Sequence, residues 1–472
     1  MPPHPNIVYI MADDMGYGDL GCYGAEKIPT PNMDRLAAEG MRFTDAHSSS
    51  AVCTPSRYSV LTGRYCWRTN LKRGVLGGLS YPLIDPARLT IAGLLKQQGY
   101  ATAAVGKWHV GLGWQTKEGI AKLCETDWED HDEADYTKRI VNGPVDLGFD
   151  YFFGIAGSLD MPPYCFIEDD HTVGIPTEEK TPYNPQQKKG RMTPGWKDEE
   201  VDLHHVAKAC DWLRETRAAD PDRPFFLYLT PSNPHRPCVP PDFLKGASDA
   251  GPRGDVVCVV DYVVGEVMDT LEEIGASEDT MIVVTSDNGA RPYDVDGDTH
   301  GHRSCGELRG FKAQIWEGGH REPFLVRWPK QVQAGTTCDD TICLMDMMAT
   351  VAELTGAELP EDAAEDSFSF APLLSGESAQ PPRGMLVHHS VEGMYALRKG
   401  RWKMILGAGP GGFHGDQLSP PQDDGLPGQL YDMETDWRET SNLWDEKPGI
   451  VTEMKEELQA IIDAGRSRPT SA

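Results

Sequence analysis

The sequence has no long apolar run and comparatively little positive charge. No stretch of about 18 apolar residues, the length that crosses a bilayer as a helix, occurs in the 472 residues. Lysine and arginine together number 44 against 73 aspartates and glutamates, so the formal net charge is −29. Such an acidic chain disfavours binding to nucleic acid or to an anionic membrane as its main activity. We therefore expect neither a nucleic acid nor a membrane as a partner.

Paired cysteine motifs and an export signal are also missing. The eleven cysteines are odd in number and show no Cys-x-x-Cys spacing, which favours reduced thiols over a disulfide framework. The opening MPPHPNIVYIMADD lacks the charged region, the long apolar region and the cleavage site of a secretory signal. We expect a cytoplasmic protein if Met1 is the natural start, and a periplasmic or secreted one if a signal has been removed.

Short apolar runs alternate with helical segments through the first three quarters of the chain. Strands are expected within residues 6–14, 101–111, 223–235 and 279–289, and helices within residues 30–40, 53–64, 89–100 and 257–275. The second of these helices should begin at Pro55, because proline suits a first helical turn. This alternation predicts an α/β fold with a mainly parallel sheet and helices on both faces.

The last quarter of the chain has a different pattern. An acidic and then proline-rich stretch at residues 357–382 looks like a connector. Beyond it, residues 395–406 and 428–443 predict antiparallel strands, and residues 449–465 predict an amphipathic helix. Two domains are therefore expected, at residues 1–370 and 371–472.

Polar and charged side chains follow the expected strands. They are Asp13, Asp14, Lys107, His109, His235, Asp287 and Asn288. Ligands of open α/β sheets bind beyond the carboxyl ends of the strands, so we expect these side chains to converge. The carboxylates and the amide suit a hard cation such as Ca²⁺ or Mg²⁺, although each pair alone could simply cap a loop. Lys107 and His109, in an extended segment, should point to the same side.

The stretch SSSAVCTPSRYSVLTGR places a lone cysteine, Cys53, before an expected helix, with Arg57 four residues on. A lone cysteine is usually a small buried hydrophobe. A helix N-terminus and a nearby arginine would instead lower the pKa of the Cys53 thiol. The same surroundings would suit a nucleophile that attacks an anionic ester.

Seven segments taken together resemble the type I, formylglycine-dependent sulfatases, the arylsulfatase family within the alkaline phosphatase-like superfamily. The matching segments are ADDMGYGDLGCYG, PTPNMDRLAAEG, CTPSRYSVLTGR, GKWHVG, PSNPH, SDNG and KAQIWEGGHREP. The resemblance implies a large mixed, mainly parallel sheet sandwiched by helices, with a smaller C-terminal α+β domain. It also implies a sulfuric ester hydrolase.

The resemblance implies a cation and a modified residue. The cation ligands would be Asp13, Asp14, Asp287, Asn288 and the modified Cys53, holding Ca²⁺ or alternatively Mg²⁺. Cys53 would be converted to formylglycine by a formylglycine-generating enzyme or an anaerobic sulfatase-maturating enzyme. That enzyme would read the sequence through Pro55 and Arg57.

The resemblance also implies roles for the basic residues. Lys107 and Lys312 would bind sulfate oxygens, and His235 would protonate the leaving alcohol. His109 would accept a proton as sulfate leaves. Ser158 would contact the hydrated aldehyde or the sulfate.

The segment HGHRSCGELRGFKAQIWEGGHREP resembles bacterial carbohydrate sulfatases, some of which act on 6-sulfated galactose or N-acetylgalactosamine. The sugar-binding candidates are His300, His302 and Arg303; a solvated polar loop is an equal alternative. Trp114, Trp128 and Tyr164 lie in a polar excursion at about residues 115–200 that should pass over the site. They would either stack on a sugar or pack in the core or at its rim.

Two other functions remain open on the sequence. One is a phosphonate monoester or phosphodiester hydrolase of the same superfamily, which would use the same aldehyde. The other is an inactive protein that binds sulfated glycans with Cys53 left as a thiol. The leading expectation is an enzyme that removes sulfate from the end of a sulfated saccharide.

Overall fold

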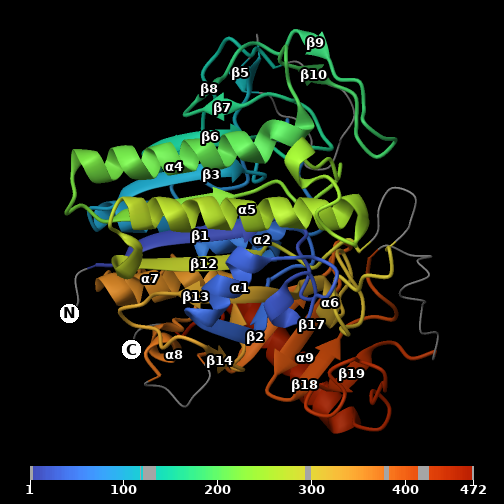
Figure 1. The fold of residues 1–472 in the computed structure, drawn as a ribbon. Helices are drawn as coiled ribbons and strands as arrows, with labels where there is room; N and C mark the ends of the chain where they lie inside the picture. Colours follow the sequence, from blue (N-terminus) through green and yellow to red (C-terminus); the bar gives the residue numbers. More distant parts are fainter. Residues whose placement is uncertain are drawn as a thin grey trace.

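A computed structural model describes residues 4–116, 119–120, 134–292, 299–376, 382–412 and 425–469. Within them, a sheet of eleven strands runs through the middle of the molecule (Figure 1). In spatial order its strands are β14 (Thr336–Cys338), β2 (Met41–His47), β13 (Arg321–Arg327), β12 (Thr280–Ser286), β1 (Asn6–Ala12), β11 (Phe225–Thr230), β3 (Ala101–Lys107), β6 (Tyr151–Ile155), β7 (Ile167–Glu168) and β8 (His171–Thr172), with β15 (Ile342–Cys343) paired beside β2.

The central five strands are parallel. β1 pairs with β12 on one side and β11 on the other, and β3 and β6 continue in the same direction. β13 runs against both β12 and β2. The expected mixed, mainly parallel sheet is confirmed, and the carboxyl ends of its central strands meet along one edge.

The large sheet has a hydrophobic core on each face, and alternating apolar side chains of β1 contribute to both. Ile7, Tyr9 and Met11 pack on one face of the sheet, and Val8 and Ile10 pack on the other. The helices of the first core are α2 (Cys53–Thr62), α3 (Ile91–Gln97) and α7 (Met347–Thr355), and those of the second are α1 (Pro31–Ala38), α4 (Val201–Ala219) and α5 (Gly251–Glu273). Figure 1 shows α1, α4 and α5 on the near face.

A smaller antiparallel sheet follows near the C-terminus, as expected. Its strands are β16 (Met385–His389), β17 (Tyr395–Lys399), β18 (Trp402–Ile405) and β19 (Gln429–Asp432), covered by α9 (Pro448–Ala464). The remaining short strands and α-helices of the described residues are β4 (Gln115–Thr116), β5 (Gly119–Ile120), β9 (Glu178–Glu179), β10 (Arg191–Met192), α6 (Glu317–His320) and α8 (Ala371–Leu374). The division at residue 370 stays a prediction.

No disulfide bond joins any of the ten cysteines that lie in the described ranges. In the same ranges no helix is both long enough and apolar enough to cross a membrane.

The helix that carries Cys53 begins earlier than expected. It starts at Cys53 itself, with Val52 extended before it, so Pro55 is its third residue rather than its first. A proline anywhere in the first turn removes no helical hydrogen bond, because those N–H groups have no acceptor within the helix. The correction places Cys53 on the first turn of a buried helix.

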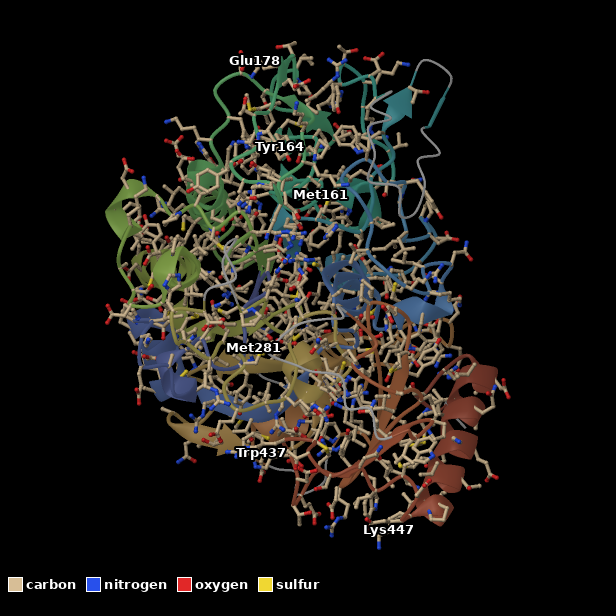
Figure 2. The ribbon with its side chains drawn as sticks, turned by 90° about the vertical axis from the view of Figure 1, so that its right-hand side faces the viewer. Met161, Tyr164, Glu178, Met281, Trp437 and Lys447 are labelled. Atoms are coloured by element: carbon tan, nitrogen blue, oxygen red, sulfur yellow. The ribbon has the colours of Figure 1, made fainter. Side chains whose placement is uncertain are left out.

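Short strands and loops make up the described part of the excursion at residues 115–200, seen at the top of Figure 1 and around Met161 and Tyr164 in Figure 2. Trp114 and Tyr164 are 2% and 1% exposed. Their polar atoms donate to the carbonyls of Gly78 and Lys188. Core packing is therefore the correct alternative for both, and neither can stack on a sugar. Trp128 lies outside the described residues.

Candidate active site

The expected cation ligands meet at the ends of two neighbouring strands. β1 and β12 are in register from Asn6 with Thr280 to Ala12 with Ser286, so the residues that follow emerge side by side. The Asn288 amide donates to Asp14 Oδ1 at 2.8 Å, and the Asp14 backbone N–H donates to Asp287 Oδ1 at 3.3 Å. The ligand atoms of Asp13, Asp14, Cys53 and His235 lie within 4.8 Å of one another.

This oxygen-rich cluster fits a hard cation. Asp13 Oδ1 and Asn288 Oδ1 are buried and accept no hydrogen bond from the described residues. Burial, with the charges of Asp287 and Asp14, raises the pKa of Asp13 to about 7, although Lys107 and Arg57 act in the opposite direction. A divalent cation would satisfy the orphaned oxygens and relieve the repulsion between the carboxylates. The residues present therefore suit Ca²⁺ or Mg²⁺.

Cys53 is 2% exposed, and its Sγ lies 3.7 Å from the Nζ of Lys312. Burial raises the pKa of the Cys53 thiol to about 12, although Lys107 and Lys312 act in the opposite direction. The expected lowering by the helix N-terminus and Arg57 is therefore wrong, because the loss of solvation outweighs both. An unmodified thiol here would be protonated at neutral pH and a poor nucleophile.

Arg57 ties α2 to the ends of two strands. Its Nε donates to Asp287 Oδ2 at 2.9 Å and its Nη1 donates to the carbonyl of Lys107 at 3.0 Å. The guanidinium is fully buried. Burial works against its charge, but Asp287 and Asp13 raise the pKa of Arg57 above its usual value. The arginine thus stays charged and fixes α2 against the carboxylates.

Two lysines each place a positive charge beside one of the two aspartates that follow β1. Lys107 Nζ donates to Asp13 Oδ2 at 2.6 Å, and Lys312 Nζ donates to Asp14 Oδ2 at 2.7 Å. Burial alone would raise the pKa of Asp14, but Lys312 holds it below the ordinary value. In a chain of net charge −29, these ammonium groups supply the local positive charge that an anionic ester needs.

His109 and His235 use different ring nitrogens for their hydrogen bonds to backbone carbonyls. His109 Nε2 donates to the Leu76 carbonyl at 2.7 Å, which leaves Nδ1 without a partner among the described residues. His235 Nδ1 donates to the Arg236 carbonyl at 2.8 Å, and its Nε2 lies 3.8 Å from Asp14 Oδ2. Because a carbonyl can only accept, these contacts assign the ring protons. Burial lowers the pKa of both histidines well below the usual value.

The expected extended geometry from Lys107 to His109 is wrong. β3 ends at Lys107, and His109 has a φ of 56°. The backbone turns because the N–H groups of Trp108 and His109 donate to the carbonyls of Ile155 and Ala156 in the neighbouring segment.

Ser158, three residues beyond the end of β6, is buried, and its hydroxyl has no hydrogen-bond partner in the described part of the chain. No hydrogen bond in the described residues joins it to Cys53, so its role stays a prediction. The sugar-binding candidates lie elsewhere. His302 Nε2 is 2.8 Å from Asp19 Oδ1, while Arg303 is largely exposed and lies 3.8 Å from Glu307.

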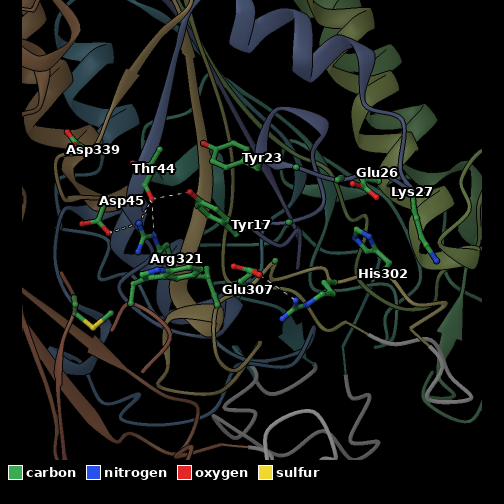
Figure 3. A pocket seen from close by; sticks show the side chains of 18 of the residues that line it. Tyr17, Tyr23, Glu26, Lys27, Thr44, Asp45, His302, Glu307, Arg321 and Asp339 are labelled. Atoms are coloured by element: carbon green, nitrogen blue, oxygen red, sulfur yellow. Dashed lines mark hydrogen bonds and ion pairs between the residues drawn. The ribbon is translucent and has the colours of Figure 1, made fainter. Parts of the chain in front are cut away.

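His302 and Arg303 line a groove of about 970 Å³ that none of the candidate catalytic residues lines. Figure 3 shows Arg321 and Tyr17 directed at the Thr44 carbonyl in this groove, at 2.8 and 3.3 Å. The sugar-binding assignment of the 300–303 segment stays a prediction.

Two buried residues that sequence reasoning missed support Asp14. Arg253 on α5 donates to the Asp14 carbonyl at 3.1 Å and pairs with Asp19 at 2.7 Å. Asp14 has a φ of 69°, a conformation that few residues other than glycine adopt. Asp19 lies within the quoted ADDMGYGDLGCYG segment, but no spacing in the sequence points to Arg253.

Comparison with known proteins agrees with this geometry. The sulfatase family model matches residues 5–357, and the model for the C-terminal region of N-sulphoglucosamine sulphohydrolase matches residues 306–464. An N-acetylgalactosamine-6-O-sulfatase of Bacteroides thetaiotaomicron is 36% identical, covering 97% of this chain and 93% of that protein. Human arylsulfatase A is 33% identical, covering 97% and 87%.

A solved structure reported under glycosaminoglycan metabolism by Bacteroides thetaiotaomicron is 33% identical. It covers 97% of this chain and 99% of its own, with a TM-score of 0.84. A sulfatase structure from Pseudoalteromonas sp. is 25% identical with a TM-score of 0.73, covering 98% of this chain and 92% of its own. On the evidence of its sequence and its fold, the chain belongs to the sulfatase family.

Proposed function

We propose that this sulfatase removes the 6-O-sulfate from a galactose or N-acetylgalactosamine residue at the end of a saccharide, using Cys53 as formylglycine and a bound Ca²⁺. The observation that carries the hydrolase assignment is the position of Lys312, whose Nζ lies between Asp14 (2.7 Å) and Cys53 Sγ (3.7 Å). An ammonium group there can bind a sulfate oxygen beside the nucleophile. The N-acetylgalactosamine-6-O-sulfatase relative supports the choice of substrate.

Asp13, Asp14, Asp287 and Asn288 would hold the cation, together with residue 53. A bound cation would polarise the sulfate ester and lower the pKa of the attacking hydroxyl. Hydrogen bonds within the chain already hold two of these ligands in place, since Arg57 donates to Asp287 and Asn288 donates to Asp14.

Residue 53 would act as an aldehyde rather than a thiol. A hydrated aldehyde offers two hydroxyls, one to attack sulfur and one whose deprotonation allows sulfate to leave. Cys53 and Arg57 are both buried in the folded chain, at 2% and 0% exposure. A converting enzyme that reads this segment must therefore act before the chain folds. Formylglycine-generating and anaerobic sulfatase-maturating enzymes are the partners we propose.

The two histidines would move protons on opposite sides of the reaction. His235 Nε2, the nitrogen free of the Arg236 carbonyl, would take up a proton when the anionic ester binds, because a nearby negative charge favours the charged imidazole, and would then give that proton to the leaving alcohol. His109 Nδ1, free because Nε2 is bonded to Leu76, would accept the proton of the second hydroxyl. Lys107 and Lys312 would balance the negative charge that develops on the sulfate.

The test is sulfate release, measured by ion chromatography, from a set of sulfated monosaccharides. Protein co-expressed with a formylglycine-generating enzyme should release sulfate from N-acetylgalactosamine 6-sulfate or galactose 6-sulfate. The 4-sulfate of N-acetylgalactosamine and the 6-sulfate of N-acetylglucosamine serve as isomer controls, and Cys53→Ala serves as the inactive control. Faster release from either isomer control would contradict the proposed specificity.

A nitrophenyl phosphonate ester measured beside nitrophenyl sulfate separates the two hydrolase classes. A higher kcat/KM for the phosphonate would favour a phosphonate monoester hydrolase. Binding of sulfated sugars without turnover, in protein shown to contain formylglycine, would favour the inactive binding protein.

A further inference from the structure

The loop that carries His235 is anchored by a buried carboxylate on a neighbouring helix. Asp202 lies in the first turn of α4 and is 2% exposed. It accepts hydrogen bonds from the backbone N–H groups of Ser232 and Asn233 and from the Asn233 amide, at 2.8, 2.9 and 2.8 Å. His235 follows two residues later.

The same loop contacts the cation-binding strand on its other side. The Asp13 backbone N–H donates to the Asn233 carbonyl at 3.1 Å. Asn233 is therefore held by Asp202 through its N–H and side chain, and by Asp13 through its carbonyl. A shift at Asn233 would move His235 relative to Asp14, whose Oδ2 lies 3.8 Å from His235 Nε2.

We propose that Asp202 is a positioning residue for His235, holding its Nε2 where it can protonate the leaving alcohol. The proposal rests on the proposed function, because it takes His235 to be the general acid. Asp202 touches neither the cation ligands nor Cys53 in any described contact, so it acts through the loop and not on the reacting atoms.

His205 holds Asp202 in turn. Its Nδ1 lies 2.9 Å from Asp202 Oδ1, one helical turn along α4. The imidazole is 1% exposed and packs edge-on against Phe153 and Phe166. With its ring fixed by packing, His205 limits the directions that the Asp202 carboxylate can take.

The chain contains a matched control for the structural effect. Asp261 on α5 is also buried, and it accepts hydrogen bonds from the backbone N–H groups of Asn32 and Met33 and from the Asn32 amide, at 3.0, 2.8 and 3.0 Å. It anchors the start of α1 in the same way that Asp202 anchors the His235 loop. At either site, an Asp→Asn change replaces an accepting carboxylate oxygen with an N–H₂ group that faces backbone N–H donors. Both changes therefore lose hydrogen bonds of the same kind. Only Asp202 lies beside a catalytic loop.

The experiment compares two substrates that differ in their need for an acid. Nitrophenyl sulfate has a good leaving group and needs little protonation, whereas a sugar sulfate has a poor one. His235→Ala should lower kcat on the sugar sulfate by about 10² to 10⁴-fold and on nitrophenyl sulfate far less. Asp202→Asn should show the same selectivity, with at least about a tenfold loss of kcat on the sugar sulfate and little change in KM.

The control and a milder variant complete the design. Asp261→Asn should lower the melting temperature about as much as Asp202→Asn while leaving both rates unchanged. His205→Asn removes only one contact of Asp202, so it should lower kcat on the sugar sulfate by less while still sparing nitrophenyl sulfate. It replaces Asp202→Asn in the experiment if that variant does not fold.

Two results would overturn the proposal in distinguishable ways. If His235→Ala shows the selectivity but the Asp202 and His205 variants slow both substrates alike, the positioning role alone fails. If His235→Ala itself slows both substrates alike, the acid assignment fails and the positioning role fails with it.

Discussion

Arg57 and Asp287 form a buried ion pair, with Nε 2.9 Å from Oδ2 and neither side chain exposed. Arg57 comes from the helix that begins at Cys53, and Asp287 comes directly after β12. One contact thus joins the helix that begins at Cys53 to one of the proposed cation ligands. The arginine four residues after Cys53 therefore has a role in the folded protein, apart from any role in recognition by a converting enzyme.

Arg57→Ala should destabilise the protein by about 3–5 kcal/mol, because it leaves Asp287 and Asp13 buried without their guanidinium partner. The measurement is chemical denaturation without divalent cations. Arg68→Ala is a matched control, since Arg68 forms a buried two-point pair with Asp366 away from the site, at 2.9 and 2.8 Å. Both variants should lose stability, but only Arg57→Ala should also lose Ca²⁺ affinity. Equal Ca²⁺ affinities would contradict the role given to Arg57.

The affinity for Ca²⁺ should fall as the pH is lowered. Burial raises the pKa of Asp13 to about 7 in the cation-free protein, and a ligand carboxylate must lose its proton to bind a cation. Below that pKa, protons compete and the affinity should drop by about tenfold per pH unit for one proton. Calorimetric titration at pH 6 and pH 8 in buffers of different ionisation enthalpy measures both the affinity and the protons released. An affinity that is equal at the two pH values would refute this prediction.

Lys312→Met should lower kcat/KM for sulfate esters by about 10² to 10³-fold, the usual loss when one donor to a developing negative charge is removed. Methionine keeps an unbranched side chain that is one atom shorter, and it lacks the ammonium group that reaches Asp14 and residue 53. The formylglycine content of the variant must be measured alongside the rate. A large loss at unchanged content supports the role, whereas normal turnover at unchanged content opposes it.

His109→Ala should slow the release of sulfate and not the departure of the alcohol. With nitrophenyl sulfate in a stopped-flow instrument, the variant should give a rapid burst of nitrophenol followed by slow turnover, because His109 Nδ1 is proposed to act after the alcohol has left. His235→Ala, tested with the same ester, should give no such burst. Slow turnover without a burst in His109→Ala would place this histidine at an earlier step.

Part of the candidate site was predictable because Asp13 and Asp287 directly follow strands and Cys53 begins a helix. The apolar runs before Asp13 and Asp287 predicted two strands, and their parallel pairing then brings the two acidic ends together. The helix at Cys53 was predicted with a start two residues late. These successes depend on local patterns that a sequence displays directly.

Other features depend on contacts between distant parts of the chain. β2 (MRFTDAH) and β13 (REPFLVR) carry polar and charged residues and give weak strand patterns. The Cys53 pKa follows from complete burial, which the polar stretch around it does not suggest. Asp202 and Arg253 lie on helices 31 and 239 residues away from the groups they hold. No spacing rule connects residues that meet only when the sheet forms.

The most direct test is to measure the mass of the tryptic peptide 43–57 and the turnover of sulfate ester on the same sample. Conversion of the Cys53 thiol to the aldehyde nucleophile lowers the peptide mass by about 18 Da. We predict that turnover rises in proportion to the converted fraction when the maturating enzyme is varied. Full turnover by protein that retains an unmodified Cys53 thiol would contradict the account.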